Sequence, residues 1–168
     1  MSPVIASDTR KEWTPAPEGL HKAVCVDVID LGVVDSQFGP RHKVRIVWQI
    51  GEISPDDHKR FEVRQMFTLS LNEKASLRKA LETWRGKKFT TDELKGFDLE
   101  KLLGANCQLQ IIHNITDEGR TFSNVQAVIP LNKGERKISA EDYVRAKDRA
   151  DRMNQPVTED ESADAIPF

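Results

Sequence analysis

The sequence predicts a mainly β fold with one helical region inside it, and three observations support this. Apolar and polar residues alternate in several stretches, a period of two that is typical of strands with one buried face. This alternation stops after residue 69, where apolar residues follow helical spacing instead. Of the 168 residues, 38% are hydrophobic and 31% are charged, which allows one compact core with a polar segment outside it.

Three strands are expected before the helical region. Residues 20–31 are rich in β-branched side chains, which favour strands, and residues 32–40 have the Gly and Pro content of a turn-rich loop. Residues 41–50 show the clearest alternation of the chain, with one apolar face and one strongly basic face. A polar loop separates them from the third strand, which is predicted at residues 60–69.

The helical region is predicted between the third and fourth strands. Ser70 begins a capping-box pattern, and Gly86 marks the end of the helix that follows. Thr90 begins a second capping-box pattern, and Asp98 is placed to cap a short helix after it. Apolar side chains at helical spacing form the buried face of the first helix: Leu77, Leu81 and Trp84.

Two further strands and a charged helix complete the expected elements. Residues 107–115 and 121–129 have strand character, and the hairpin turn between them contains Gly119 where a positive φ is needed. Ser139 begins a capping signal that predicts a helix reaching about residue 153. Residues 154–168 have no periodicity and carry four acidic side chains and no basic one, so they are expected to form a disordered acidic tail.

This order of elements is that of an OB-fold, a five-stranded, partly open barrel that binds oligonucleotides or oligosaccharides. Five strands also form sandwiches, so the position of the helices between the third and fourth strands is what favours the barrel. The chain is accordingly divided into four parts: an irregular N-terminal arm (1–19), an OB-fold domain (20–131), a charged linker and helix (132–153) and the acidic tail (154–168).

Basic side chains on two neighbouring strands point to a nucleic-acid groove. Alternation places Arg41, Lys43 and Arg45 on one face of the second strand. Arg60 and Arg64 share a face of the third strand. Such a groove would bind a sugar-phosphate backbone with salt-dependent and sequence-independent affinity. The alternative interpretation is a solvated strand face that prevents aggregation, and the predicted barrel favours binding over it.

Single-stranded nucleic acids also stack their bases on aromatic rings. Phe38 is the leading candidate for stacking, because it lies at the tip of the first hairpin loop. Phe122 is the second candidate, since it follows the last hairpin turn and has Arg120 nearby. Trp48 and Trp84 fall on apolar faces and are expected in the core.

No catalytic or metal-binding pattern is evident, so the chain is expected to be a non-enzyme without metal or cofactor. Its four histidines are scattered without metal-ligand spacing, and no phosphate-binding glycine loop is present. Cys25 and Cys107 alternate with aliphatic residues and are expected to be buried. The absence of a long apolar stretch and of a secretory signal predicts a cytoplasmic protein that does not enter a membrane.

The sequence ends in an acidic segment followed by Ile166, Pro167 and Phe168. This ending resembles the C-terminal tip of bacterial single-stranded DNA-binding proteins. The resemblance implies a tip that binds replication and repair proteins, with Asp164 and the three final residues making the contact. One departure is Ala165, which separates the last aspartate from Ile-Pro-Phe where that family usually has consecutive aspartates, so the affinity for partners is expected to be weaker or differently selective.

The body, roughly residues 20–131, resembles phage-encoded single-stranded DNA-binding proteins with OB-folds. The resemblance rests on the first strand and on three segments: Ser-Leu-Asn-Glu-Lys-Ala-Ser-Leu-Arg (70–78), Trp-Arg-Gly (84–86) and Phe-Asp-Leu-Glu-Lys-Leu-Leu-Gly (97–104). It implies a protein that protects single-stranded DNA during replication or recombination in a bacterial host cytoplasm. The oligomeric state is open, with a homo-oligomer among the alternatives. Two rival functions also remain: a protein-interaction adaptor that binds no DNA, and a metal-dependent enzyme such as a nuclease.

Overall fold

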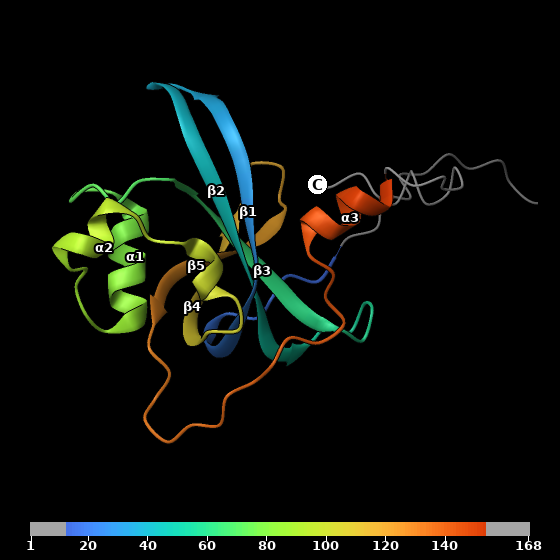
Figure 1. Cartoon of the computed structure of the whole chain (residues 1–168). Coiled ribbons are helices and arrows are strands. Elements are labelled where there is room, and N and C mark those ends of the chain that lie inside the picture. Colours follow the sequence, from blue (N-terminus) through green and yellow to red (C-terminus); the bar gives the residue numbers. More distant parts are fainter. Residues whose placement is uncertain (1–12, 154–168) are drawn as a thin grey trace, which may run out of the picture.

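The computed structural model describes residues 13–153 and is built on a five-stranded antiparallel sheet (Figure 1). The strand order is β3-β2-β1-β4-β5. The helices lie between β3 and β4 and after β5. The elements, in chain order, are β1 (Gly19–Ser36), β2 (Gly39–Ile53), β3 (Arg60–Thr68), α1 (Ser76–Arg85), α2 (Thr91–Lys95), the 3₁₀ helix η1 (Leu99–Leu102), β4 (Asn106–Ile115), β5 (Thr121–Ile129) and α3 (Ala146–Met153).

The long strand β1 joins the two parts of the sheet. Its first residues, 19–24, pair with β4, and residues 23–36 pair with β2. The register shifts twice along the β1–β2 pairing, between Cys25 and Asp27 and between Asp30 and Gly32. Such bulges bend a strand and increase its twist, so they curve the sheet. The predicted loop over 32–40 is wrong, because the two strands stay paired up to Ser36 and Gly39.

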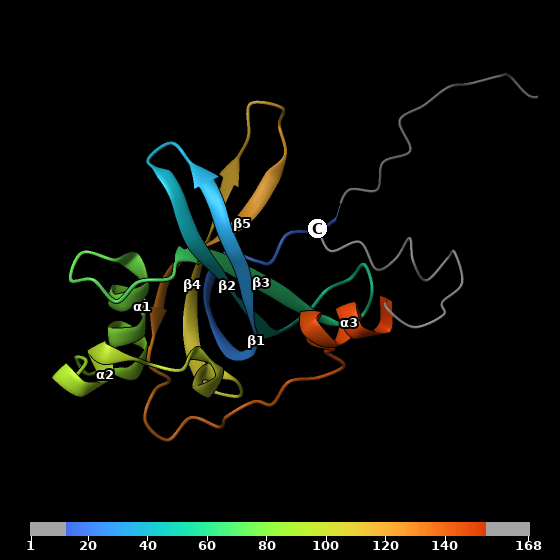
Figure 2. The same ribbon diagram turned by 45° about the horizontal axis from the view of Figure 1, so that its top comes forward.

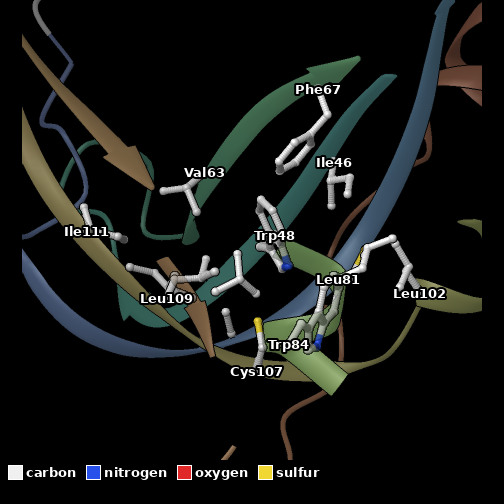
Figure 3. Packing of buried hydrophobic residues seen from close by; sticks show 14 of the residues in the cluster. Ile46, Trp48, Val63, Phe67, Leu81, Trp84, Leu102, Cys107, Leu109 and Ile111 are labelled. Carbon is white, nitrogen blue, oxygen red and sulfur yellow. The ribbon is translucent and has the colours of Figure 1, made fainter. Parts of the chain in front are cut away.

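The core fills the concave side of this curved sheet (Figure 3). Trp48 of β2 is fully buried against Trp84 of α1, with ring centroids 5.8 Å apart. The indole Nε1 of Trp84 donates a hydrogen bond to the Asn106 carbonyl oxygen at 3.0 Å, which fixes α1 to the start of β4. Both tryptophans are therefore core residues, as the sequence predicts, and Cys25 and Cys107 are buried beside them as free thiols.

The caps of the helical region follow the sequence in part. Thr90 and Glu93 form the predicted capping box, and Asp98 caps η1 through the backbone N–H of residue 100. Gly86 ends α1 with a φ of 73°. The predicted start at Ser70 is wrong: the Ser70 and Asn72 side chains accept hydrogen bonds from backbone N–H groups two residues on, and α1 begins only at Ser76.

A non-helical segment crosses the outer side of the sheet between β5 and α3, drawn in orange in Figures 1 and 2. We call residues 138–146, which are the last residues of this segment and the first residue of α3, the strap. The predicted helix from Ser139 is wrong over residues 139–145, where backbone groups bond to side chains of the sheet, and the helix begins only at Ala146. The Gln49 amide accepts from the Glu141 N–H at 2.8 Å and donates to the Glu141 carbonyl at 2.7 Å. Asn106 forms the same reciprocal pair with Ile138, at 2.8 and 2.9 Å.

The prediction of a mainly β fold with five strands and a helical insertion is confirmed. The edges of the sheet are β3 and β5, which approach each other without a hydrogen-bonded ladder among the described residues. None of the helices in the described part of the chain is long and apolar enough to cross a membrane.

Candidate nucleic-acid interface

Four cations lie on the outer face of β2 and β3, toward the β1–β2 hairpin. Core residues Val44, Ile46 and Trp48 point inward, so alternation turns Arg41, Lys43 and Arg45 outward. On β3, Arg64 faces outward in register with Val47 of β2, diagonally next to Arg45. We call Arg41, Lys43, Arg45 and Arg64 the basic half-face. The backbone positions of neighbouring cationic residues on β2 are about 6.8 Å apart along the strand.

The cations of β2 have uncharged neighbours in the register of the sheet. On the β1 side, Arg41, Lys43 and Arg45 are in register with Val34, Gly32 and Ile29, respectively. On the β3 side, Lys43 and Arg45 are in register with Thr68 and Met66. Opposite charges in directly opposed positions stabilise a sheet, and this arrangement does not use them. The positive charge of the face is therefore not offset by carboxylates in the adjacent register positions.

Two of these cations, Arg41 and Lys43, contact uncharged groups. Arg41 Nη1 donates to the carbonyl of Pro40 at 2.9 Å, and Lys43 Nζ donates to Thr68 Oγ1 at 2.8 Å. Arg64 lies 3.8 Å from the carboxylate of Glu62 on the same strand. Burial lowers the pKa of Arg64 and Glu62 opposes this, while Arg45 and Arg149 lower it further. Arg64 thus lies near the guanidinium groups of Arg45 and Arg149 and near the carboxylate of Glu62.

Arg60, which the sequence places in the same groove, lies apart from these four residues. Its guanidinium donates to the Ser139 carbonyl at 2.5 Å and to the Glu141 carboxylate at 3.0 Å. Only 13% of the Arg60 side chain is exposed. Arg60 therefore holds the strap, and its charge has a carboxylate partner.

The first aromatic candidate, Phe38, lies at the tip of the β1–β2 hairpin and is 75% exposed. Its N–H donates to Ser36 Oγ at 3.2 Å, and Gly39 follows with a φ of 96°. This hairpin and the β4–β5 hairpin project from the same side of the molecule (Figure 2). Phe38 is thus next to the Arg41 end of the basic half-face, as expected from the sequence.

The other candidates, Arg120 and Phe122, line a cleft of about 580 Å³ between β3 and the β4–β5 hairpin. Arg64 also lines it, so the cleft continues from the basic half-face. Its remaining walls come from the N-terminal arm, from β3 and from the hairpin: Trp13, Thr14, Pro15, Glu62, Val63, Gly119, Thr121 and Ser123. Gly119 has the positive φ predicted for it, 84°.

Trp13 is an aromatic residue of this cleft that is not among the binding residues predicted from the sequence. It is 60% exposed, whereas the other two tryptophans are buried. The arm that carries it is fixed at two points. The Thr14 N–H donates to Asp56 Oδ2 at 2.6 Å, and the carbonyl of the buried residue Ala16 accepts from His113 Nε2 at 2.6 Å. The sequence feature that could have pointed to this residue is a single tryptophan among polar residues, just before two prolines.

The opposite half of the outer face is covered by the strap, whose main anchor is Asp27. Ile138 and Tyr143 pack on Val24, Val26 and Val47. The buried carboxylate of Asp27 accepts hydrogen bonds at 2.7–3.0 Å from three strap groups: Tyr143 OH, Arg145 Nε and the Ala146 N–H. Burial acts to raise the pKa of Asp27, but these three donors outweigh it and hold the pKa below its usual value.

Other chemistry-bearing groups do not assemble in the part of the chain that the structure describes. Burial raises the pKa of the Cys25 thiol to about 12, and that of Cys107 is raised as well, so neither is a ready nucleophile. No group of three or more His, Cys, Asp or Glu side chains within residues 13–153 could hold a metal ion. The predicted partner-binding residues lie outside the described residues: Asp164, Ile166, Pro167 and Phe168.

Comparison of the chain with protein-family models and with curated proteins gives no match.

Proposed function

We propose that this protein binds single-stranded DNA without sequence preference, on an OB-type barrel formed by its five strands. The observation that carries the proposal is the basic half-face, in which Lys43 and Arg45 have uncharged register neighbours on both adjoining strands and Arg41 has one on β1. A face that served solubility alone would gain stability from opposite charges in register. A row of cations beside apolar side chains instead suits a flexible polyanion with exposed bases.

Apolar groups next to the cations favour a single strand over a duplex. Phe38, Met66 and Phe122 are all about half exposed or more, at 75%, 53% and 48%. Bases of a single strand can stack on such groups, whereas a duplex keeps its bases paired and presents mainly phosphates. The proposed site therefore offers charge for the backbone and apolar surface for the bases.

The proposal extends to the biological role. The protein would protect single-stranded DNA in replication or recombination, and residues 154–168 would recruit replication and repair proteins through Asp164, Ile166, Pro167 and Phe168. Four acidic side chains in this segment and its apolar final residues suit a basic pocket with an apolar floor. The compartment that fits this role is the cytoplasm.

The direct test is a titration of a fluorescently labelled oligo-dT with the full chain, followed by anisotropy at two salt concentrations. We expect saturable binding that weakens with salt, with a log–log slope of about −0.7 per phosphate contacted. Unlabelled duplex should compete poorly. Absence of saturable binding at low salt would overturn the proposal and favour a protein-interaction adaptor.

A further inference from the structure

We propose that the cleft between β3 and the β4–β5 hairpin receives a base of the bound strand, and that Trp13 of the N-terminal arm is the ring on which this base stacks. This inference rests on the proposed function and names a subsite within it. It adds a contact made by a segment that lies outside the five strands.

The size and position of the cleft fit one nucleotide. Its volume of about 580 Å³ is within the range of pockets that take small ligands. Arg64 belongs both to its wall and to the basic half-face, so a strand lying along β2 can turn a base into the cleft at Arg64. Arg120 lies on the opposite wall, on the β4–β5 hairpin, and offers a second cation for the neighbouring phosphate.

Different parts of the cleft lining suit the base and the phosphates of a nucleotide. Two aromatic side chains, Trp13 and Phe122, are 60% and 48% exposed and provide the apolar surface. Glu62 also lines the cleft, and its carboxylate repels phosphate but accepts hydrogen bonds from amino or imino groups of a base. The base edge is therefore the part of a nucleotide that suits the Glu62 side, and the phosphates suit the two arginines.

The arm holds Trp13 in place before any ligand binds. Thr14, the next residue, forms two hydrogen bonds with the Asp56 carboxylate of the β2–β3 loop, at 2.6 and 3.2 Å. Ala16 is 3% exposed and its carbonyl is bound by His113 of β4. These anchors belong to the β2–β3 loop and to β4, which lie in different halves of the sheet. A ring fixed in this way costs less conformational entropy when it stacks on a base.

The chain supplies its own reporter for this contact. Of its three tryptophans, Trp48 and Trp84 are 0% and 7% exposed, so a ligand that reaches an indole face reaches Trp13. We expect oligo-dT to quench the tryptophan emission of the full chain in parallel with the anisotropy change. A backbone of the same length made of abasic residues should bind through its phosphates and leave the emission unchanged.

Variants of Trp13 test how much this residue contributes to the affinity for DNA. Trp13→Ala should weaken oligo-dT binding by about 10-fold, the order expected for loss of one stacked base, and should abolish the quenching. Trp13→Phe keeps an aromatic ring and should bind within about twofold of the wild type while losing the signal. Ile115→Ala is the matched control, because Ile115 is a 73% exposed apolar residue of β4 that does not line the cleft. It should leave affinity and quenching unchanged.

The outcomes separate the two proposals. Normal anisotropy with unquenched emission, and a Trp13→Ala variant that binds like the wild type, would overturn the role of the cleft and leave DNA binding intact. Absence of binding in every protein would overturn both. A Trp13→Ala variant that has lost its melting transition would show a structural role, and the quenching by oligo-dT and the affinity of Trp13→Phe would then decide the question.

Discussion

The two halves of the outer face of the sheet use positive charge in opposite ways. In the half under the strap, cations meet carboxylates: Arg60 with Glu141 at 3.0 Å and Arg145 with Asp27 at 3.0 Å. In the basic half-face, the cations of β2 have uncharged register neighbours. The comparison teaches that the first half uses its charges to fix the chain to itself, whereas the cations of the second half are not matched by carboxylates in register, as the proposed binding of DNA requires.

The strength of the two kinds of contact differs with burial. Asp27 is 1% exposed, so its carboxylate has little water to replace a lost donor. Breaking a buried ion pair by removing one partner costs far more than breaking an exposed one. Substitutions in the strapped half should therefore change the stability of the fold, and those in the basic half-face should change ligand affinity.

The largest expected effect comes from the strap anchor. Asp27→Ala should lower the free energy of unfolding by about 3 kcal/mol, because it leaves the Arg145 guanidinium and the Ala146 N–H without their carboxylate. Glu100→Ala removes the exposed partner of the same arginine and should cost about 1 kcal/mol at most. Urea unfolding of both variants measures the difference. Equal losses would contradict the role of Asp27 as the main anchor.

The next effect concerns affinity. The triple change Arg41→Gln, Lys43→Gln and Arg45→Gln should weaken oligo-dT binding by about 100-fold near 50 mM salt and make the log–log salt slope shallower by about 2. The melting temperature should stay the same. Arg60→Gln is the matched change in the strapped half, and it should leave the affinity unchanged while lowering stability by up to about 1 kcal/mol. An equal loss of affinity in both would show that the two halves act as one site.

The pH dependence of stability also distinguishes the two halves of the outer face. Because the folded pKa of Asp27 is below its ordinary value of 3.8, its contribution to stability is complete above that value and is lost as the pH falls through the folded pKa. The stability gap between the wild type and Asp27→Ala should therefore be constant near neutral pH and narrow below about 3.8. Chemical denaturation over a pH series checks this, and a gap that persists at acid pH would contradict it.

The smallest effect is expected from the acidic tail. Deleting residues 154–168 removes four carboxylates that can compete with DNA for the basic half-face. We expect oligo-dT binding to tighten by about twofold at low salt and to change less at high salt, where charges are screened. A tail of the same length with Asn and Gln in place of its acids is the matched control and should behave like the deletion. Unchanged or weaker binding in both would exclude the competition.

Much of the sheet follows from the sequence because one face of each strand is buried. Trp48 and Phe67 lie in the core as their alternation predicts, and a shift by one residue would turn each strand over. The end of the first hairpin is less predictable. The Gly and Pro residues in 32–40 indicate a loop, but Gly32 is at a bulge and Pro40 pairs with Asp35, so the strands continue.

The strap could not be found from local signals. The pattern from Ser139 is that of a helix start, yet the partners of this segment are Gln49 and Asn106, far away in the sequence. The hydrogen-bond donors to Asp27 could not be predicted from its neighbouring sequence either, since they lie more than a hundred positions later. Side-chain pairs of this kind depend on the folded sheet, whereas a capping pattern reflects only residues that are close together in the sequence.

The site was predictable where strand alternation decides it. Arg41, Lys43 and Arg45 share a face for that reason, and Phe38 is exposed because it lies at a hairpin tip. Trp13 was not predictable, because its position depends on hydrogen bonds from the arm to Asp56 and His113. Arg60 and Arg64 look equivalent in the sequence, and only the strap distinguishes them.

The order in which the chain is synthesised gives the Asp27 anchor a consequence for biogenesis. Tyr143 and Ala146 follow Asp27 by 116 and 119 residues, so all five strands leave the ribosome before these donors do. Until then Val24, Val26 and Val47 form an uncovered apolar strip on an otherwise completed sheet. A nascent or prematurely terminated chain that stops before residue 138 lacks Ile138 and Tyr143 and would therefore expose a hydrophobic surface to chaperones and to neighbouring chains.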